Sequence, residues 1–178
     1  PLIDKDQKKS ISLVKKILSK FPSQYEKNWV EMMKNKLGIV GYDKKDKLLI
    51  SELLKWMQKK GADYTNTFCY LMGEFDGEYK IFRDKDFSSW RKKWSERRKL
   101  NNSNLKESLN LMKKFNPLII PRNYYVEDAL NEAINYNFSK IKNLLEVLSF
   151  PYKRNKNTNY FQIYNGKKNE KYVTFCGT

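Results

Sequence analysis

Length, composition and charge indicate a globular protein. The chain has 178 residues, of which 40% are apolar and 31% are charged, and its formal net charge is +16. A chain of this length can bury about 70% of its unfolded surface in one core. No stretch approaches the roughly 20 apolar residues that a membrane-spanning helix needs. These numbers favour one compact unit and exclude a membrane span.

The residue types that are missing exclude several kinds of chemistry. The sequence contains no histidine, which is the commonest general acid-base group and metal ligand. Its two cysteines, Cys69 and Cys176, are too far apart in sequence to form a metal-binding motif. The glycines stand apart from one another, so they form no glycine-rich phosphate loop. The sequence therefore predicts no zinc site, no Ser-His-Asp system and no phosphate loop.

The first two predicted helices lie in the first 40 residues. Apolar residues recur at helical spacing over 11–18, and this helix is expected to end at Phe21-Pro22 because proline has no amide donor. Lysines interrupt these apolar residues, so they do not form a secretory signal, and we expect a cytoplasmic location. A second helix is predicted from Ser23 or Gln24, with Met32 and Met33 inward, to Gly38.

The third and fourth predicted helices have clear end signals. Asp43 is expected to cap the third helix, which Gly61 ends after two lysines. Asp63 then precedes a fourth helix over 64–75, and its carboxylate is placed to accept hydrogen bonds from the free amides of the first turn. We interpret Asp63 as a cap, and a catalytic acid is the alternative.

A basic aromatic helix is predicted to begin at about Asp86. Its aromatic stripe of Phe87, Trp90 and Trp94 is more typical of a core than of a base-stacking platform. The remaining faces carry cations, which offer an alternative function in binding nucleic acid through phosphate contacts. These cations are Arg91, Lys92, Lys93, Arg97, Arg98 and Lys99. Because lysine is scattered over the whole chain, we favour solvated surfaces over a nucleic-acid site.

The second half of the chain continues the helical pattern. Helices are predicted over 103–115 and 139–150, with Pro151 ending the second, and residues 117–121 are expected to be extended. Asn123 is the expected N-cap of a helix between them. Arg122 is interpreted as a structural residue whose guanidinium binds carbonyls or a carboxylate beside this extended segment. A nucleotide-phosphate contact is the alternative for Arg122.

The pattern as a whole predicts an all-α protein that forms an irregular multi-helix bundle. No fixed repeat period links the helices, which argues against a solenoid. We expect residues 1–150 to form the helical domain and residues 151–178 an extended, non-helical tail. A short hairpin over 160–175 is the alternative for the end of that tail, because Asn165-Gly166 is a typical hairpin turn. The many tyrosines and tryptophans leave apolar surface for another domain.

Several sequence segments resemble the C-terminal region of the selenoprotein O family, SelO, also called YdiU. The resemblance is strongest from Asn116-Pro117 through Pro121-Arg122-Asn123-Tyr124 and Leu144–Leu148 to Pro151-Tyr152. It extends upstream to the segments 33–38, 54–57 and 61–68. Two departures occur, since Lys153-Arg154-Asn155 replaces a stretch that is often acidic in the family, and the chain ends Cys176-Gly177-Thr178 instead of Cys-Ser-Ser.

The resemblance implies a role within a larger enzyme. Members of this family resemble kinases in fold and transfer AMP from ATP to hydroxyl side chains of other proteins, with Mg²⁺ or Mn²⁺. Their catalytic residues lie upstream of the region matched here, so the resemblance assigns no catalytic, cofactor-binding or metal-binding residue to this chain. We therefore expect a fragment that is inactive alone, braces its own upstream kinase-like domain and shares the protein substrates of the parent enzyme.

Cys176 is the candidate redox residue. The resemblance suggests that this cysteine pairs reversibly with the catalytic domain, and a free surface thiol without a role is the alternative. Cys69 follows a helical stripe and is expected to be a small core residue. Two alternatives to the fragment interpretation remain. One is the binding of nucleic acid, and the other is a stand-alone helical domain that binds proteins.

Overall fold

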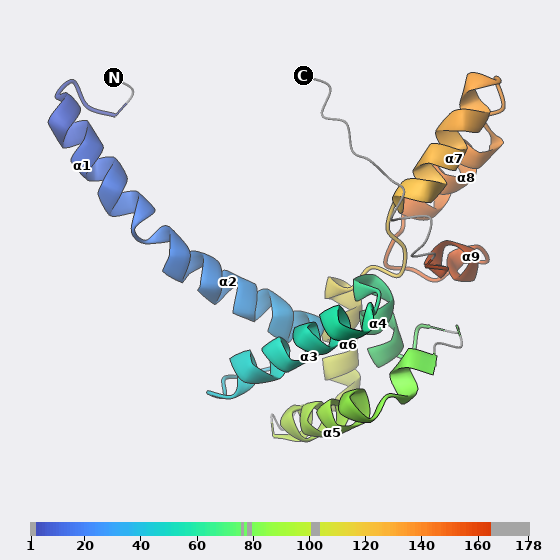
Figure 1. The fold of residues 1–178 in the computed structure, drawn as a ribbon, viewed down its shortest axis with the longest axis horizontal. Coiled ribbons are helices and arrows are strands. Elements are labelled where there is room, and N and C mark those ends of the chain that lie inside the picture. Colours follow the sequence, from blue (N-terminus) through green and yellow to red (C-terminus); the bar gives the residue numbers. More distant parts are fainter. Residues whose placement is uncertain (1–2, 76, 78–79, 101–103, 165–178) are drawn as a thin grey trace.

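All regular structure that we observe is helical. The computed structural model describes residues 3–75, 77, 80–100 and 104–164, and Figure 1 shows its fold. The elements in chain order are α1 (Gln7–Leu18), α2 (Phe21–Lys36), α3 (Asp46–Lys60), α4 (Tyr64–Leu71), the 3₁₀ turn η1 (Lys80–Arg83), α5 (Lys85–Lys99), α6 (Leu105–Phe115), α7 (Asn123–Ile134), α8 (Ser139–Leu148) and α9 (Thr158–Gln162). Within the described ranges, this confirms the predicted all-α class.

The core lies where the end of α2 meets α3, α4, α5 and α6. Its aromatic part contains Trp56, Phe87, Trp90 and Trp94, all of which are buried. The indole nitrogen of Trp90 donates to the carbonyl of Leu49 at 2.8 Å, and that of Trp94 donates to the carbonyl of Leu37 at 2.8 Å. The aromatic stripe of α5 is therefore core, because its polar groups are satisfied inside the protein.

Several helix ends differ from the prediction by a few residues. Helix α2 begins at Phe21 rather than Ser23, because a proline in the first helical turn needs no amide partner. Helix α3 begins at Asp46, so Asp43 lies before the helix and its carboxylate accepts from the amide of Lys45 instead. Helix α5 begins at Lys85 because Asp84 caps it. These shifts change the first residues and the caps of α2, α3 and α5, but the order of these helices is as predicted.

Gly38 allows α2 and α6 to approach closely. Its φ of +65° is in the left-handed region that favours glycine. A Cβ atom at this position would lie 2.4 Å from the hydroxyl oxygen of Ser108 in α6. That hydroxyl donates to the carbonyl of Gly38 at 2.6 Å and accepts from Nε of Arg98 at 2.7 Å. The contact joins α2, α5 and α6.

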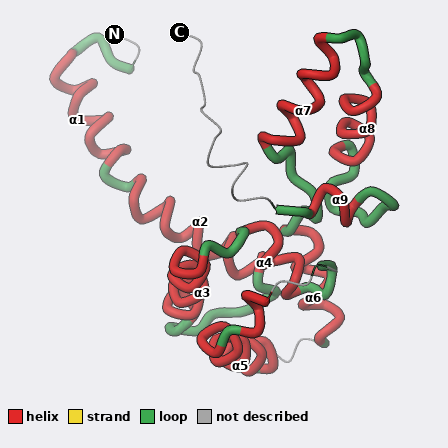
Figure 2. Tube along the Cα trace, turned by 45° about the vertical axis from the view of Figure 1, so that its right-hand side comes forward, coloured by secondary structure: helices red, strands yellow, loops and turns green. Residues whose placement is uncertain are grey.

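Helices α7 and α8 form an antiparallel hairpin beside the core. Figures 1 and 2 show this hairpin projecting from the body formed by α3 to α6. The amides of Leu118 and Ile119 donate to the carbonyl of Pro151, which joins the segment before α7 to the segment after α8. The expected extended tail contains one short helix, α9, which takes up residues 160–162 of the alternative hairpin. Residues 165–178, where its second strand was predicted, lie outside the described residues.

Helices α1 and α2 form an arm that leaves the body. Figures 1 and 2 show α1 at the far end of this arm, away from the other helices. No residue of α1 is buried. Met32, which was predicted to point inward, is exposed, and so are Leu130 of α7 and Leu145 of α8. The arm and the α7–α8 hairpin therefore carry apolar side chains that the described residues do not cover.

Candidate functional site

Asp63 and Arg122 form a buried ion pair between α4 and the start of α7. Two guanidinium nitrogens of Arg122 donate to the two carboxylate oxygens of Asp63, each at 2.8 Å. The same carboxylate accepts from the amide of Asn66 at 2.8 Å, so it also caps α4. Arg122 donates further to the side-chain oxygen of Asn66 at 3.2 Å. The structure thus directs this guanidinium to a carboxylate and an amide, as expected for a structural residue.

Asn123 is not the N-cap of α7, which corrects the prediction. It is the first helical residue, and Arg122 occupies the cap position without a side-chain cap bond. The amides of Tyr125 and Val126 already bond to the carbonyl of Arg122, so the helix begins one residue earlier than expected. The Arg122 side chain is held by Asp63, which fixes the chain direction at this point. Of the predicted site residues, Asp63 and Arg122 are brought together, and Asn123 stays exposed beside them.

A second buried ion pair joins α3 to α5 and was missed by the sequence analysis. Nε of Arg97 donates to one carboxylate oxygen of Asp46 at 2.6 Å, and an outer guanidinium nitrogen donates to the other at 3.0 Å. Only 8% and 3% of these side chains are exposed. The signal was present in the spacing, since Arg97 follows Trp90 and Trp94 on the same helix face. A polar residue in an apolar stripe indicates a buried partner.

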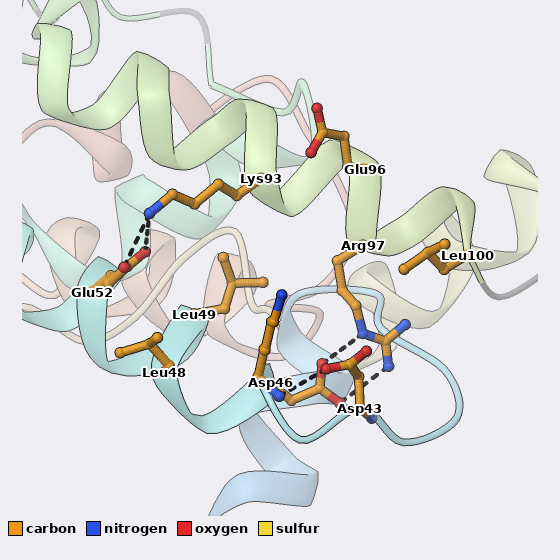
Figure 3. A pocket seen from close by; sticks show the side chains of 10 residues that line it. Asp43, Asp46, Leu48, Leu49, Glu52, Lys93, Glu96, Arg97 and Leu100 are labelled. Atoms are coloured by element: carbon orange, nitrogen blue, oxygen red, sulfur yellow. Dashed lines mark hydrogen bonds and ion pairs between the residues drawn. The ribbon is translucent and has the colours of Figure 1, made fainter.

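A cavity of about 490 Å³ lies over this second pair. Figure 3 shows Arg97 facing Asp46 on one side of the cavity, and Lys93 of α5 facing Glu52 of α3 on another. Leu48, Leu49 and Leu100 supply its apolar lining. Because two of its carboxylates are already bound to cations, the cavity is a mixed-charge groove between two helices.

The described residues contain no grouped set of metal ligands. In residues 3–75, 77, 80–100 and 104–164, no three Asp, Glu, Cys or His side chains are grouped so that they could hold a metal ion. Asp46 and Glu52 in the cavity are bound by Arg97 and Lys93, which compete with any cation for their oxygens.

Most of the cations that could have bound nucleic acid are engaged within the protein. Arg97 is buried against Asp46, and Lys93 binds Glu52. Arg98 lies over the Trp94 ring and Arg91 lies over the Tyr70 ring. A phosphate-binding face needs its cations free to meet the backbone. In α5, Arg91, Lys93, Arg97 and Arg98 thus each have a partner within the protein.

Cys69 is buried in the core, with its Sγ atom 3.6 Å from the carbonyl oxygen of Pro117. Burial and then the charge of Asp63 raise the pKa of this thiol to about 12. The thiolate is the reactive form of cysteine, so Cys69 is inert in the folded protein. Cys176, the candidate redox residue, lies outside the described residues.

We expect Cys69 to be protected from thiol reagents until the chain unfolds. In a Cys176→Ser variant at pH 8, DTNB should label the folded chain far more slowly than the chain in urea. The folded pKa exceeds the unfolded value of 9.0, so the unfolded chain loses its proton first. The stability contributed by Cys69 is therefore complete below about pH 9 and is lost as the pH rises toward 12. Equal labelling rates in the two states would contradict this burial.

Exposed apolar side chains gather on the arm. We define the arm stripe as the exposed apolar side chains of α1 and the first turns of α2, namely Ile11, Leu13, Ile17, Leu18, Phe21 and Tyr25. Contiguous apolar surface of this kind marks an interaction site. Among the described residues, no helix is long and apolar enough to cross a membrane. The fold and its surface thus define a class: an all-helical module with internal ion pairs and a large uncovered apolar face.

Comparison with known proteins gives the family. The sequence model described as protein adenylyltransferase SelO matches residues 7–149. The chain is 40% identical over its whole length to the protein nucleotidyltransferase YdiU of Pelagibacter ubique, and 39% identical to that of Nitrosococcus oceani. It is 40% identical to the protein of the same name from Clostridium perfringens. This chain belongs to the SelO family.

The match covers only part of the relatives. All of this chain is aligned, but it spans 37% of the length of the Pelagibacter ubique protein and 36% of the lengths of the other two. About two thirds of each relative therefore has no counterpart in these 178 residues.

Proposed function

We propose that these residues are the C-terminal helical domain of a SelO-type protein adenylyltransferase, and that the chemistry lies in a kinase-like domain outside them. The observation that carries this proposal is the end-to-end match to relatives called protein nucleotidyltransferases, of which the chain spans 37% in the first case. ATP and Mg²⁺ or Mn²⁺ would bind the kinase-like domain, and the helical domain would brace that domain.

A chimera tests this proposal. The matching segment of the Pelagibacter ubique relative is replaced by these 178 residues, and transfer of label from α-³²P-ATP to protein is measured with Mg²⁺ or Mn²⁺. We expect the chimera to transfer AMP and the isolated 178-residue chain to transfer none, because its described residues contain no group of three Asp, Glu, Cys or His side chains that could hold the metal ion. The intact relative is the positive control. Transfer by the isolated chain, or an inactive chimera beside an active control, would overturn the proposal.

We propose a redox role for Cys176 in the same enzyme. Its thiol would form a disulfide with the thiol of a cysteine in the kinase-like domain, and the two thiols would together give two protons and two electrons to oxidised glutathione, which is reduced to two glutathione thiols. The buried thiol of Cys69, with its raised pKa, is a poor competitor for this reaction. We expect dithiothreitol to change AMP transfer by the oxidised chimera, and a Cys176→Ser chimera to be insensitive to it. An equal response of both chimeras would reject the role.

A further inference from the structure

The arm stripe has no covering surface in the described structure. Figure 2 shows α1 at the end of the arm, with no other helix beside it. Ile17 is 66% exposed, Leu18 is 62% exposed and Phe21 is 63% exposed. The rings of Phe21 and Tyr25 stack with their centroids 6.0 Å apart, so these two side chains form one aromatic patch at the start of α2. Within α1, Ile11 and Leu18 are seven residues apart and Leu13 and Ile17 are four apart, so each pair shares a face of the helix.

Helix α1 needs a partner surface to be stable. It has 12 residues, and isolated helices of about this length are marginal in water. Asp6 caps its first turn by accepting from the amides of Lys8 and Lys9. Most helical stability in proteins comes from packing an amphipathic face. With no buried residue, α1 lacks that contribution here.

The charge beside the stripe identifies the kind of partner. Helix α1 contains four lysines and no acidic residue. Lys15 is one helical turn from Ile11 and Leu18, and Lys16 is one turn from Leu13, so cations border the stripe on both sides. Two copies of α1 packed together would place lysines against lysines, which opposes a symmetric dimer. A surface edged with Asp and Glu is complementary.

We infer that the arm stripe docks on an apolar groove edged with carboxylates in the part of the SelO-type polypeptide that these 178 residues leave out. This inference rests on the proposed function. That part is large enough to provide the groove, because the chain spans only 37% of the Pelagibacter ubique relative. The lysines orient the arm, and the stripe of α1 and α2 supplies the buried apolar area.

Hydrogen exchange of the chimera and of the isolated chain tests the docking. We expect α1 amides to exchange at least about tenfold more slowly in the chimera, because docking suppresses local unfolding. An Ile17→Ser/Leu18→Ser double variant should lose this protection and lower the thermal midpoint of the chimera. The same variant should leave the midpoint of the isolated chain unchanged, since both side chains are exposed there.

A matched control uses apolar side chains away from the arm. Leu130 and Ile134 on α7 are 49% and 75% exposed. A Leu130→Ser/Ile134→Ser chimera should keep full protection of α1. Loss of protection in this control, or equal exchange of α1 in the chimera and the isolated chain, would overturn the inference.

A second measurement needs no chimera. It tests whether a second copy of this chain covers the arm stripe instead of the missing part of the polypeptide. Sedimentation of the isolated chain should show a monomer, and its α1 amides should exchange rapidly. A dimer that dissociates in the Ile17→Ser/Leu18→Ser variant would make a second copy the occupant and overturn the inference. A chimera with a protected α1 but no AMP transfer would overturn the proposed function alone. A chimera that transfers AMP with an unprotected α1 would overturn the docking alone.

Discussion

Replacing Arg97 by alanine is expected to lower the free energy of unfolding by about 3–5 kcal/mol. The change removes the bidentate partner of Asp46 and leaves that carboxylate buried and unpaired, with 3% of its side chain exposed. Arg97 also donates to the carbonyl of Val40 at 3.3 Å, so the loop before α3 loses an anchor. Urea unfolding followed by circular dichroism measures the loss. Arg97→Lys should recover only part of it, because an ammonium cannot form the two parallel bonds.

The control for Arg97 lies one turn earlier on the same helix. Lys93 binds Glu52 of α3 at 3.0 Å, but these side chains are 59% and 33% exposed. Lys93→Ala should cost less than about 1 kcal/mol, because water screens the pair. A double variant, Asp46→Leu with Arg97→Met, should be more stable than Arg97→Ala, since it leaves no orphaned charge. Equal losses of unfolding free energy for Lys93→Ala and Arg97→Ala would show that burial does not make the Asp46–Arg97 pair more stabilising than the exposed pair.

Replacing Arg122 by alanine is expected to have an effect of similar size, about 3–5 kcal/mol. The side chains of Arg122 and Asp63 are 6% and 10% exposed, and the change leaves the carboxylate without its guanidinium. Arg122 also holds Asn66, whose side-chain nitrogen donates to the carbonyl of Gln162 in α9 at 2.7 Å. Besides the loss in urea unfolding, we expect faster hydrogen exchange in α9.

Two further variants separate the ion pair from the cap. Asp63→Asn keeps an oxygen that can cap α4 but removes the charge, so a loss close to that of Arg122→Ala is expected if the pair dominates. Lys140→Ala removes an exposed cation that binds Asp128 and Glu132, and should cost less than about 1 kcal/mol. A silent Asp63→Asn variant would mean that Asp63 acts only as a cap.

Local signals predicted the elements that local chemistry controls. Gly61 ends α3 in the left-handed conformation, and Asp63 sits at the N-cap of α4, because both effects depend on neighbours in sequence. Asn123 shows where such signals fail. Its side chain suits a cap, but the chain at Arg122 is fixed by an ion pair to a residue 59 positions away. The cap preference of one side chain is too small to override that contact.

The buried charges were harder to predict than the buried apolar residues. Arg97 was grouped with the exposed cations of α5, although it continues the face of Trp90 and Trp94. Asp46 gave no signal of burial, since a carboxylate in the first turn of a helix is usually explained by the helix dipole. Asp46 and Arg97 are 51 positions apart in sequence. Burial of either charge can be predicted only when the other is known to be its partner.

By itself, the sequence determined the all-α class, the order of the helices and the relation to the SelO family. The spacing of apolar residues, prolines, glycines and capping residues acts over a few positions in sequence. The segments that resemble the family are likewise visible in the sequence itself. Only the tertiary structure decided which charges are buried, that Arg122 holds Asp63 and that α1 buries none of its residues against the described helices. Those features depend on residues far apart in sequence meeting in space, and a periodic pattern contains no information about which partner a face will meet.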